Sequence, residues 1–121
     1  MTQQQVKEKI LLHIKALASK NHKVQRKGFE YLVQTFYENP EDLDIEELDY
    51  LDIYSITLAM MHTFIKGLIE TEEDYETAAI VMQIKKKVES EVAENIETSD
   101  DLYDFQLTND YYNQQLYKIT K

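Results

Sequence analysis

Carboxylates are the side chains of this chain with the greatest potential for chemistry, and they concentrate in one segment. Residues 38–52 contain eight Asp and Glu residues within fifteen positions. A cluster of this density attracts a basic surface or a cation, and steers a charged partner toward the site. The residues predicted to bind a partner are Asp42, Asp44, Glu46, Glu47, Asp49, Tyr50 and Asp52.

A second interpretation of these carboxylates is enzymatic. All-helical hydrolases of nucleoside triphosphates hold Mg²⁺ with acidic residues from two helices, and Mg²⁺ prefers oxygen ligands. The chain has Glu-x-x-Asp at Glu46 and Asp49, and Glu-x-x-Glu at Glu91 and Glu94. The simplest interpretation is that many of these acids cap helices and solvate the surface.

Other kinds of catalytic group have little support in the sequence. The three histidines, His13, His22 and His62, show neither Glu-x-x-His nor His-Glu-x-x-His spacing. We expect His62 to be partly buried and the other two to lie on the surface. None of the serines lies in a Gly-x-Ser-x-Gly motif, and there is no cysteine to act as a nucleophile or thiolate ligand. No catalytic residue, metal ligand or cofactor is therefore predicted.

The charge of the chain is divided along its length. Residues 1–28 carry seven Lys or Arg and one Glu, a net charge of +6, whereas residues 29–121 carry a net charge of −16. The basic residues around the first turn are Lys15, Lys20, Lys23, Arg26 and Lys27. They offer an alternative function as a nucleic-acid binder, but an overall charge of −10 repels a phosphate backbone. Direct nucleic-acid binding is therefore disfavoured.

Composition predicts an all-α fold in a single domain, residues 1–121. Only two glycines and one proline occur, which excludes glycine-rich phosphate loops and disfavours a sheet with many tight turns. No apolar run reaches the roughly 18 residues of a membrane span, and the polar N-terminus does not resemble a secretory signal. Together with the absence of cysteine, this predicts a cytoplasmic protein without a membrane association.

Apolar residues recur at helical spacing, which predicts a compact bundle of four to five mostly antiparallel helices. Thr2 with Gln5, Asn39 before Pro40, and Thr71 with Asp74 are candidate helix starts. Gly28 falls on an apolar face, where it would allow a close helix approach, although a strand over 29–37 is the competing assignment. The predicted helices are residues 3–19, 23–37, 45–69, 72–96 and 100–119.

The helix over 45–69 is the most apolar, so we expect it to be central in the bundle. Val24 and Ile80 are expected to join the buried stripes of their own helices. Apolar residues cover more than half the circumference of the helix over 45–69, which is compatible with self-association.

These features favour a non-enzymatic interaction protein over the two alternatives. The expected function is that of a small regulator or inhibitor, of bacterial or phage type by its composition. It would bind a basic partner protein through an acidic, tyrosine-bearing surface. Mimicry of nucleic acid by spaced carboxylates is one form of this hypothesis.

Overall fold

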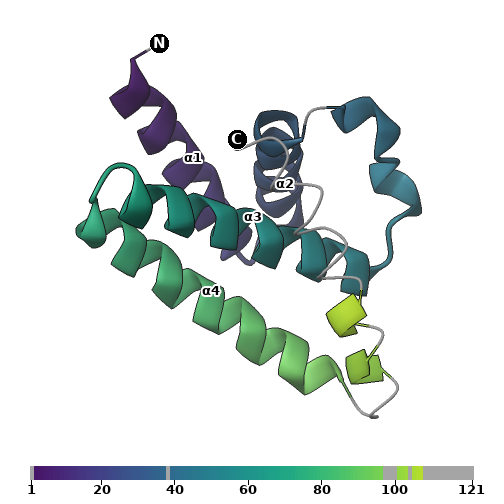
Figure 1. The fold of residues 1–121 in the computed structure, drawn as a ribbon. Helices are drawn as coiled ribbons and strands as arrows, with labels where there is room; N and C mark the ends of the chain where they lie inside the picture. Colours follow the sequence, from purple (N-terminus) through teal and green to yellow (C-terminus); the bar gives the residue numbers. More distant parts are fainter. Residues whose placement is uncertain (1, 38, 97–100, 104, 108–121) are drawn as a thin grey trace.

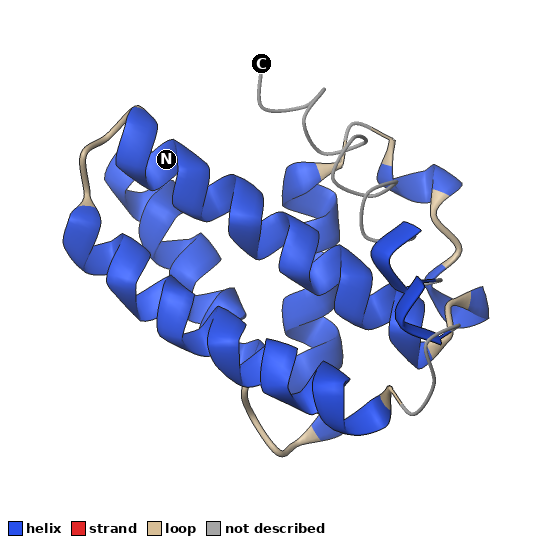
Figure 2. Cartoon of the chain, turned by 60° about the horizontal axis from the view of Figure 1, so that its bottom comes forward, coloured by secondary structure: helices blue, strands red, loops and turns tan. Residues whose placement is uncertain are grey.

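The structure, a computed structural model, describes residues 2–37, 39–96, 101–103 and 105–107, and leaves out the side chains of residues 50, 51 and 95. Every regular element in these residues is helical, which confirms the all-α prediction (Figures 1 and 2). The elements are α1 (Gln3–Leu17), α2 (His22–Phe36), the 3₁₀ turns η1 (Pro40–Asp42) and η2 (Ile45–Glu47), α3 (Tyr50–Glu70) and α4 (Tyr75–Asn95).

The first two helices begin with the local caps that the sequence indicates. Thr2 Oγ1 accepts from the backbone N–H of Gln5, and Gln5 Oε1 accepts from the N–H of Thr2. The amide oxygen of Asn21 caps α2, so that helix begins at His22, one residue earlier than predicted. Residues 29–36 are helical, which excludes the competing strand.

The predicted start of the third helix at residue 45 is wrong. Only one 3₁₀ turn forms at Ile45–Glu47, and Asp44 makes no side-chain capping bond. The backbone N–H of Leu48 donates to the carbonyl of Ile45, which closes that turn. Asp49 and Asp52 form the capping box instead, so α3 begins at Tyr50.

The predicted start of the fourth helix at residue 72 is also wrong, because the preceding residues complete the end of α3. The N–H groups of Thr71 and Glu72 donate to the carbonyl of Gly67, and that of Asp74 donates to Leu68. Glu73 adopts a φ of 54°, outside the helical region. Helix α4 therefore begins at Tyr75, with Asp74 as its cap.

The core lies between two helical hairpins. Helix α1 packs mainly against α2, and α3 against α4; Figure 1 shows α3 and α4 side by side in front of α1 and α2. Seven consecutive residues of α3, Ser55 to Met61, are buried, as its predicted central position requires. Val24 and Ile80 are 40% and 39% exposed, so their predicted burial is wrong.

The predicted helix over 100–119 lies largely outside the described residues. Residues 101–103 and 105–107 are helical, and Phe105 packs against the core. Leu102 is 45% exposed.

Gly28 brings α1 and α2 together, as its place in the sequence predicts. It is buried, and a Cβ atom there would lie 2.8 Å from the carbonyl oxygen of His13 and 3.1 Å from Cβ of Ala16. The first distance is below van der Waals contact with a backbone atom, which cannot rotate away. The α1–α2 crossing therefore requires glycine at this position.

Substitution Gly28→Ala should destabilise the protein by about 1–3 kcal/mol, because the overpacking exceeds the roughly 1 kcal/mol gain in helix propensity. Urea unfolding measures this change. Gly67→Ala is the matched control, since a Cβ at Gly67 meets nothing within 4 Å, and it should stabilise by about 0.5–1 kcal/mol. Equal effects of the two substitutions would contradict the close approach.

An ion pair joins α1 to the start of α4. Lys7 Nζ lies 2.8 Å from Asp74 Oδ2, and both side chains are largely covered. Asp74 also accepts from the N–H and the hydroxyl of Thr77, at 3.1 Å and 2.8 Å. The bond from Lys7, followed by those from Thr77, lowers the pKa of Asp74 to about 2. One carboxylate thus caps α4 and fixes it to α1.

The depressed pKa predicts a specific acid sensitivity. The carboxylate contributes stability above its unfolded pKa of about 4, and this contribution is lost as the pH falls through about 2. Asp74→Asn, which keeps a capping oxygen, should show a shallower loss of stability between about pH 4 and pH 2. The measurement is the urea midpoint as a function of pH; parallel curves for both proteins would refute the assignment.

Candidate functional site

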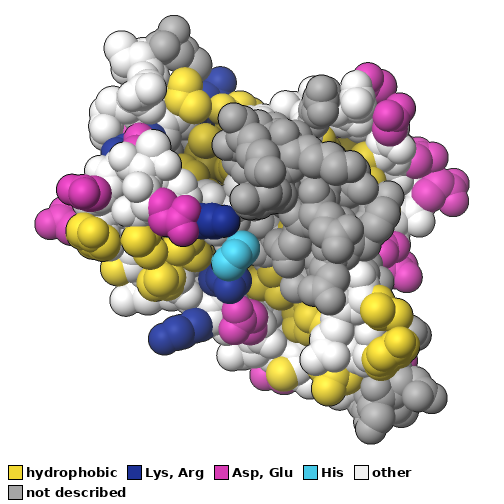
Figure 3. All heavy atoms as spheres, in the orientation of Figure 1, with side chains coloured by type: hydrophobic (Ala, Val, Ile, Leu, Met, Phe, Trp, Pro, Cys, Tyr) yellow, Lys and Arg dark blue, Asp and Glu magenta, His cyan; other side chains and the backbone are white. Residues whose placement is uncertain are grey.

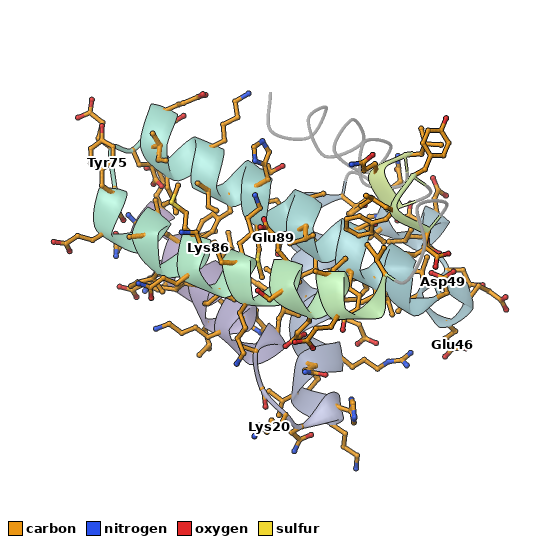
Figure 4. The ribbon with its side chains drawn as sticks, turned by 90° about the horizontal axis from the view of Figure 1, so that it is seen from below. Lys20, Glu46, Asp49, Tyr75, Lys86 and Glu89 are labelled. Carbon is orange, nitrogen blue, oxygen red and sulfur yellow. The ribbon has the colours of Figure 1, made fainter. Side chains whose placement is uncertain are left out.

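The predicted partner-binding residues lie together at one end of the molecule. Figure 4 shows Glu46 and Asp49 at the end opposite Tyr75, and acidic side chains gather along the same edge in Figure 3. Asp42 belongs to η1, Glu46 and Glu47 to η2, and Asp44 precedes η2. Tyr50 is the first residue of α3, and its side chain lies outside the described part. These residues therefore lie together, but some of them cap helix α3 and others have no capping role.

Asp49 and Asp52 have a structural role. Asp49 Oδ1 accepts from the N–H of Asp52 at 2.8 Å, and Asp52 Oδ2 accepts from the N–H of Asp49 at 3.4 Å. Partial burial, and then the charge of Asp49, raise the pKa of Asp52 above its ordinary value. Both carboxylates are committed to the first turn of α3, so they contribute to a binding surface only by their charge.

Asp42, Asp44, Glu46 and Glu47 have no such role. All four are exposed, and Glu46 makes the one ion pair found for them among the described residues, 3.8 Å from Arg26. That pair contributes a few tenths of a kcal/mol at most, since both side chains are well solvated. We call these four residues, with Glu41, the acidic segment. Its charge is available to a partner.

A cavity adjoins the acidic segment. Its volume is about 420 Å³, and residues from α1, α2, η2, α3 and α4 line it. Phe29, Thr57 and Val88, all buried, belong to its lining, and Ile45 contributes from η2, next to Glu46. The other lining residues are Leu17, His22, Gln25, Arg26, Ile53, Tyr54 and Glu91. An apolar hollow with charged residues among its lining is typical of a recognition site.

Sequence reasoning missed this cavity, because the hairpin crossing brings its lining together from five separate elements. One local signal exists: Ile45 interrupts the acidic segment, and it is partly buried against the core. An apolar side chain inside an exposed acidic run indicates a contact with the body of the protein.

No arrangement for metal chemistry is found in the described residues. No three His, Asp or Glu side chains among them come close enough to hold a metal ion. His13 stacks on Tyr31 with ring centroids 3.9 Å apart, and His22 is exposed. His62 is also exposed, not partly buried as predicted; residual desolvation, then Lys85 and Lys66, lower its pKa.

The basic residues of the first hairpin form a solvated edge. Lys15, Lys20, Lys23, Arg26 and Lys27 are all exposed, and Figure 4 shows Lys20 at the tip of the α1–α2 hairpin. Arg26 is engaged by Glu30 at 3.1 Å and by Glu46. These two carboxylates offset positive charge at Arg26.

Two further apolar features lie away from the acidic segment. On α4, Tyr75 and Met82 are 62% and 42% exposed and lie seven residues apart, on one face of the helix. A hollow of about 350 Å³ lies near the end of α4, lined in part by Val92, Ile96 and Phe105. Exposed carboxylates also flank Tyr75, namely Glu70, Glu72, Glu73 and Glu76, and Glu89 lines the hollow.

No helix in the described residues is both long and apolar enough to cross a membrane. No family model matches the chain, and neither a curated protein nor a solved structure matches it. Inference about its function therefore rests on the geometry of the acidic segment and the cavity.

The division of the acids into two kinds can be tested by single substitutions. Asp49→Ala should destabilise the protein by about 1 kcal/mol, because it removes a helix cap. Asp44→Ala should change stability by less than about 0.5 kcal/mol, since its side chain makes no capping bond. Urea unfolding of both variants measures the difference, and a loss at Asp44 as large as that at Asp49 would contradict it.

Proposed function

We propose that this chain is a non-enzymatic protein-interaction module that binds a partner with a basic surface through the acidic segment. The observation that supports the proposal is the solvent exposure of Asp42, Asp44, Glu46 and Glu47, which the helices do not use as caps. Four carboxylates within six positions repel one another, and a cationic partner would relieve that repulsion. A regulator or inhibitor acting in the cytoplasm fits such a surface.

The side chain of the predicted Tyr50 lies outside the described part, and Tyr54 is a second tyrosine near the acidic segment. It is partly buried and lines the cavity beside the acidic segment. Tyr103 is 62% exposed in the described 101–103 segment. Tyrosine near a carboxylate-rich edge adds contact area together with a polar tip.

Mimicry of nucleic acid is one form of the proposal. These carboxylates lie on two successive 3₁₀ turns and not along one regular helix. If the partner is a nucleic-acid enzyme, duplex DNA should compete with this chain for it. Absence of competition would favour a partner whose basic surface has another role.

The test is charge reversal with a matched control. The triple variant Asp44→Lys, Glu46→Lys, Glu47→Lys alters the acidic segment but spares the α3 cap. Glu70→Lys, Glu72→Lys, Glu73→Lys makes the same change in net charge at the exposed α3–α4 turn. Both should remain folded, since these side chains are exposed.

We expect the first variant to lose about tenfold or more in affinity for a partner captured from cell extract, and the control to stay within about twofold. Raising the salt concentration from about 50 to 300 mM should weaken the wild-type complex, because exposed charges are screened. Unchanged capture by the first variant, or an equal loss in both, would overturn the proposal.

A further inference from the structure

We propose that the exposed face of α4 binds a second copy of this chain, with the two α4 helices antiparallel about a two-fold axis. This face begins at Tyr75, at the end of the molecule opposite Glu46 and Asp49 (Figure 4), so the inference does not depend on the proposed function. Its support comes from the exposed apolar residues of α4, from the order of the charges along the helix and from the pairing that this order allows.

The outward face of α4 carries an apolar stripe. Tyr75, Ala79 and Met82 are exposed, and their spacing of four and three residues places them on one side of the helix. The buried Val81 and Val88 lie on the other side, toward the core. We call the three exposed residues the α4 stripe. A surface that covers it gains free energy by removing apolar area from water.

Charges of opposite sign lie at the two ends of the α4 stripe. Glu73 and Glu76 flank Tyr75, and Lys86 and Lys87 follow beyond Met82; all four charged side chains are exposed. A basic partner would be attracted to the first end and repelled by the second, and an acidic partner the reverse. A second copy that runs antiparallel pairs both ends at once. The order of charges therefore favours a second copy over a partner of uniform charge.

The four charges at the ends of the α4 stripe are also available. No ion pair within the described residues involves Glu73, Glu76, Lys86 or Lys87. Exposed charges of this kind lose little hydration when they pair across the rim of an interface, and they determine its orientation.

The spacing of the stripe also predicts the register. When Ala79 of one copy lies beside Met82 of the other, a small residue faces a large one, which allows the two helices to pack closely. The same register places Lys86 of each copy beside Tyr75 and Glu76 of the other, where its ammonium group can contact both the ring and the carboxylate. The contact from Tyr75 to Lys86 covers about 17 Å of helix, which is short, so we expect a weak dimer.

One pair of like charges opposes this register. Glu72 of each copy would lie near Glu89 of the other. Glu89 Oε1 is already 3.4 Å from Lys85 Nζ, which offsets its charge. The remaining carboxylates of α4, Glu91 and Glu94, lie beyond the end of the contact.

The first test is a charge swap followed by sedimentation equilibrium over about 10 µM to 1 mM, the range of a weak dimer. One variant is Glu73→Lys, Glu76→Lys, and the other is Lys86→Glu, Lys87→Glu. The matched control is the variant Asp44→Lys, Glu46→Lys, Glu47→Lys, which leaves α4 unchanged. Circular dichroism and thermal unfolding ensure that folded proteins are compared.

We expect the wild-type chain to dimerise in this range, and each α4 variant alone to dimerise at least about tenfold more weakly. An equimolar mixture of the two α4 variants should recover the wild-type affinity within about threefold, because every reversed charge then meets an opposite one. The acidic-segment control should dimerise like the wild type.

The second test concerns orientation and uses the absence of cysteine from the chain. Ala79→Cys and Ala93→Cys each introduce one thiol at an exposed alanine of α4. In the antiparallel register the two copies of residue 79 lie near the two-fold axis, whereas those of residue 93 are separated by about 37 Å along the helices. Oxidised glutathione should therefore link Ala79→Cys chains at least about tenfold faster than Ala93→Cys chains.

Several results would overturn the inference. A monomer at every concentration would refute it, and so would a dimer that neither α4 variant weakens. Faster linking of Ala93→Cys would indicate a different arrangement of the two helices. Loss of the dimer only in the acidic-segment control would place the self-contact there and would contradict the proposed function as well. A monomer whose α4 stripe becomes protected from hydrogen exchange by the captured partner would assign this face to that partner.

Discussion

Burial of helix α3 is the constraint on which the rest of the structure depends. Seven consecutive residues, Ser55 to Met61, are buried, which one neighbouring helix cannot achieve because successive residues point around the whole circumference. Helix α4 covers one side, and the α1–α2 hairpin crosses behind (Figure 1). Within that hairpin, Gly28 brings the two helix backbones together. The ion pair of Lys7 with Asp74 then ties the outer ends of α1 and α4.

The packing around α3 also bears on which acids cap helices and which remain exposed. The turns η1 and η2 connect the end of α2 to the start of α3 at the edge of the bundle. No longer helix forms in the described part of this connection. Asp49, Asp52 and Asp74 are used to start helices, so their carboxylates stabilise the fold. The acidic segment is left on the outside, beside a cavity that the crossing of the hairpins leaves open. A binding role is the explanation we propose for this surplus charge.

Local signals made much of the fold predictable, and long-range packing accounts for what was not. Thr2 with Gln5 located the first helix, and the aromatic run after Gly28 was correctly assigned to a helix. The starts of α3 and α4 were placed too early, because several Asp, Glu and Thr residues compete as caps, and Asp49 and Asp74 are the ones that form the capping bonds. Glu73, for instance, leaves the helical region so that α3 can end. The grouping of the acidic residues was foreseen, but the cavity was not, since it exists only where five elements meet.

Hydrogen–deuterium exchange of the chain, alone and in complex with the captured partner, tests the central claim most directly. In the isolated chain, amides of η1 and η2 should exchange fast and those of buried α3 slowly, because few apolar contacts hold the 3₁₀ turns. In the complex, slowing should concentrate on residues 41–48 and on amides around the cavity. Slowing confined to the exposed stripe of Tyr75 and Met82 on α4, with residues 41–48 unchanged, would contradict the account.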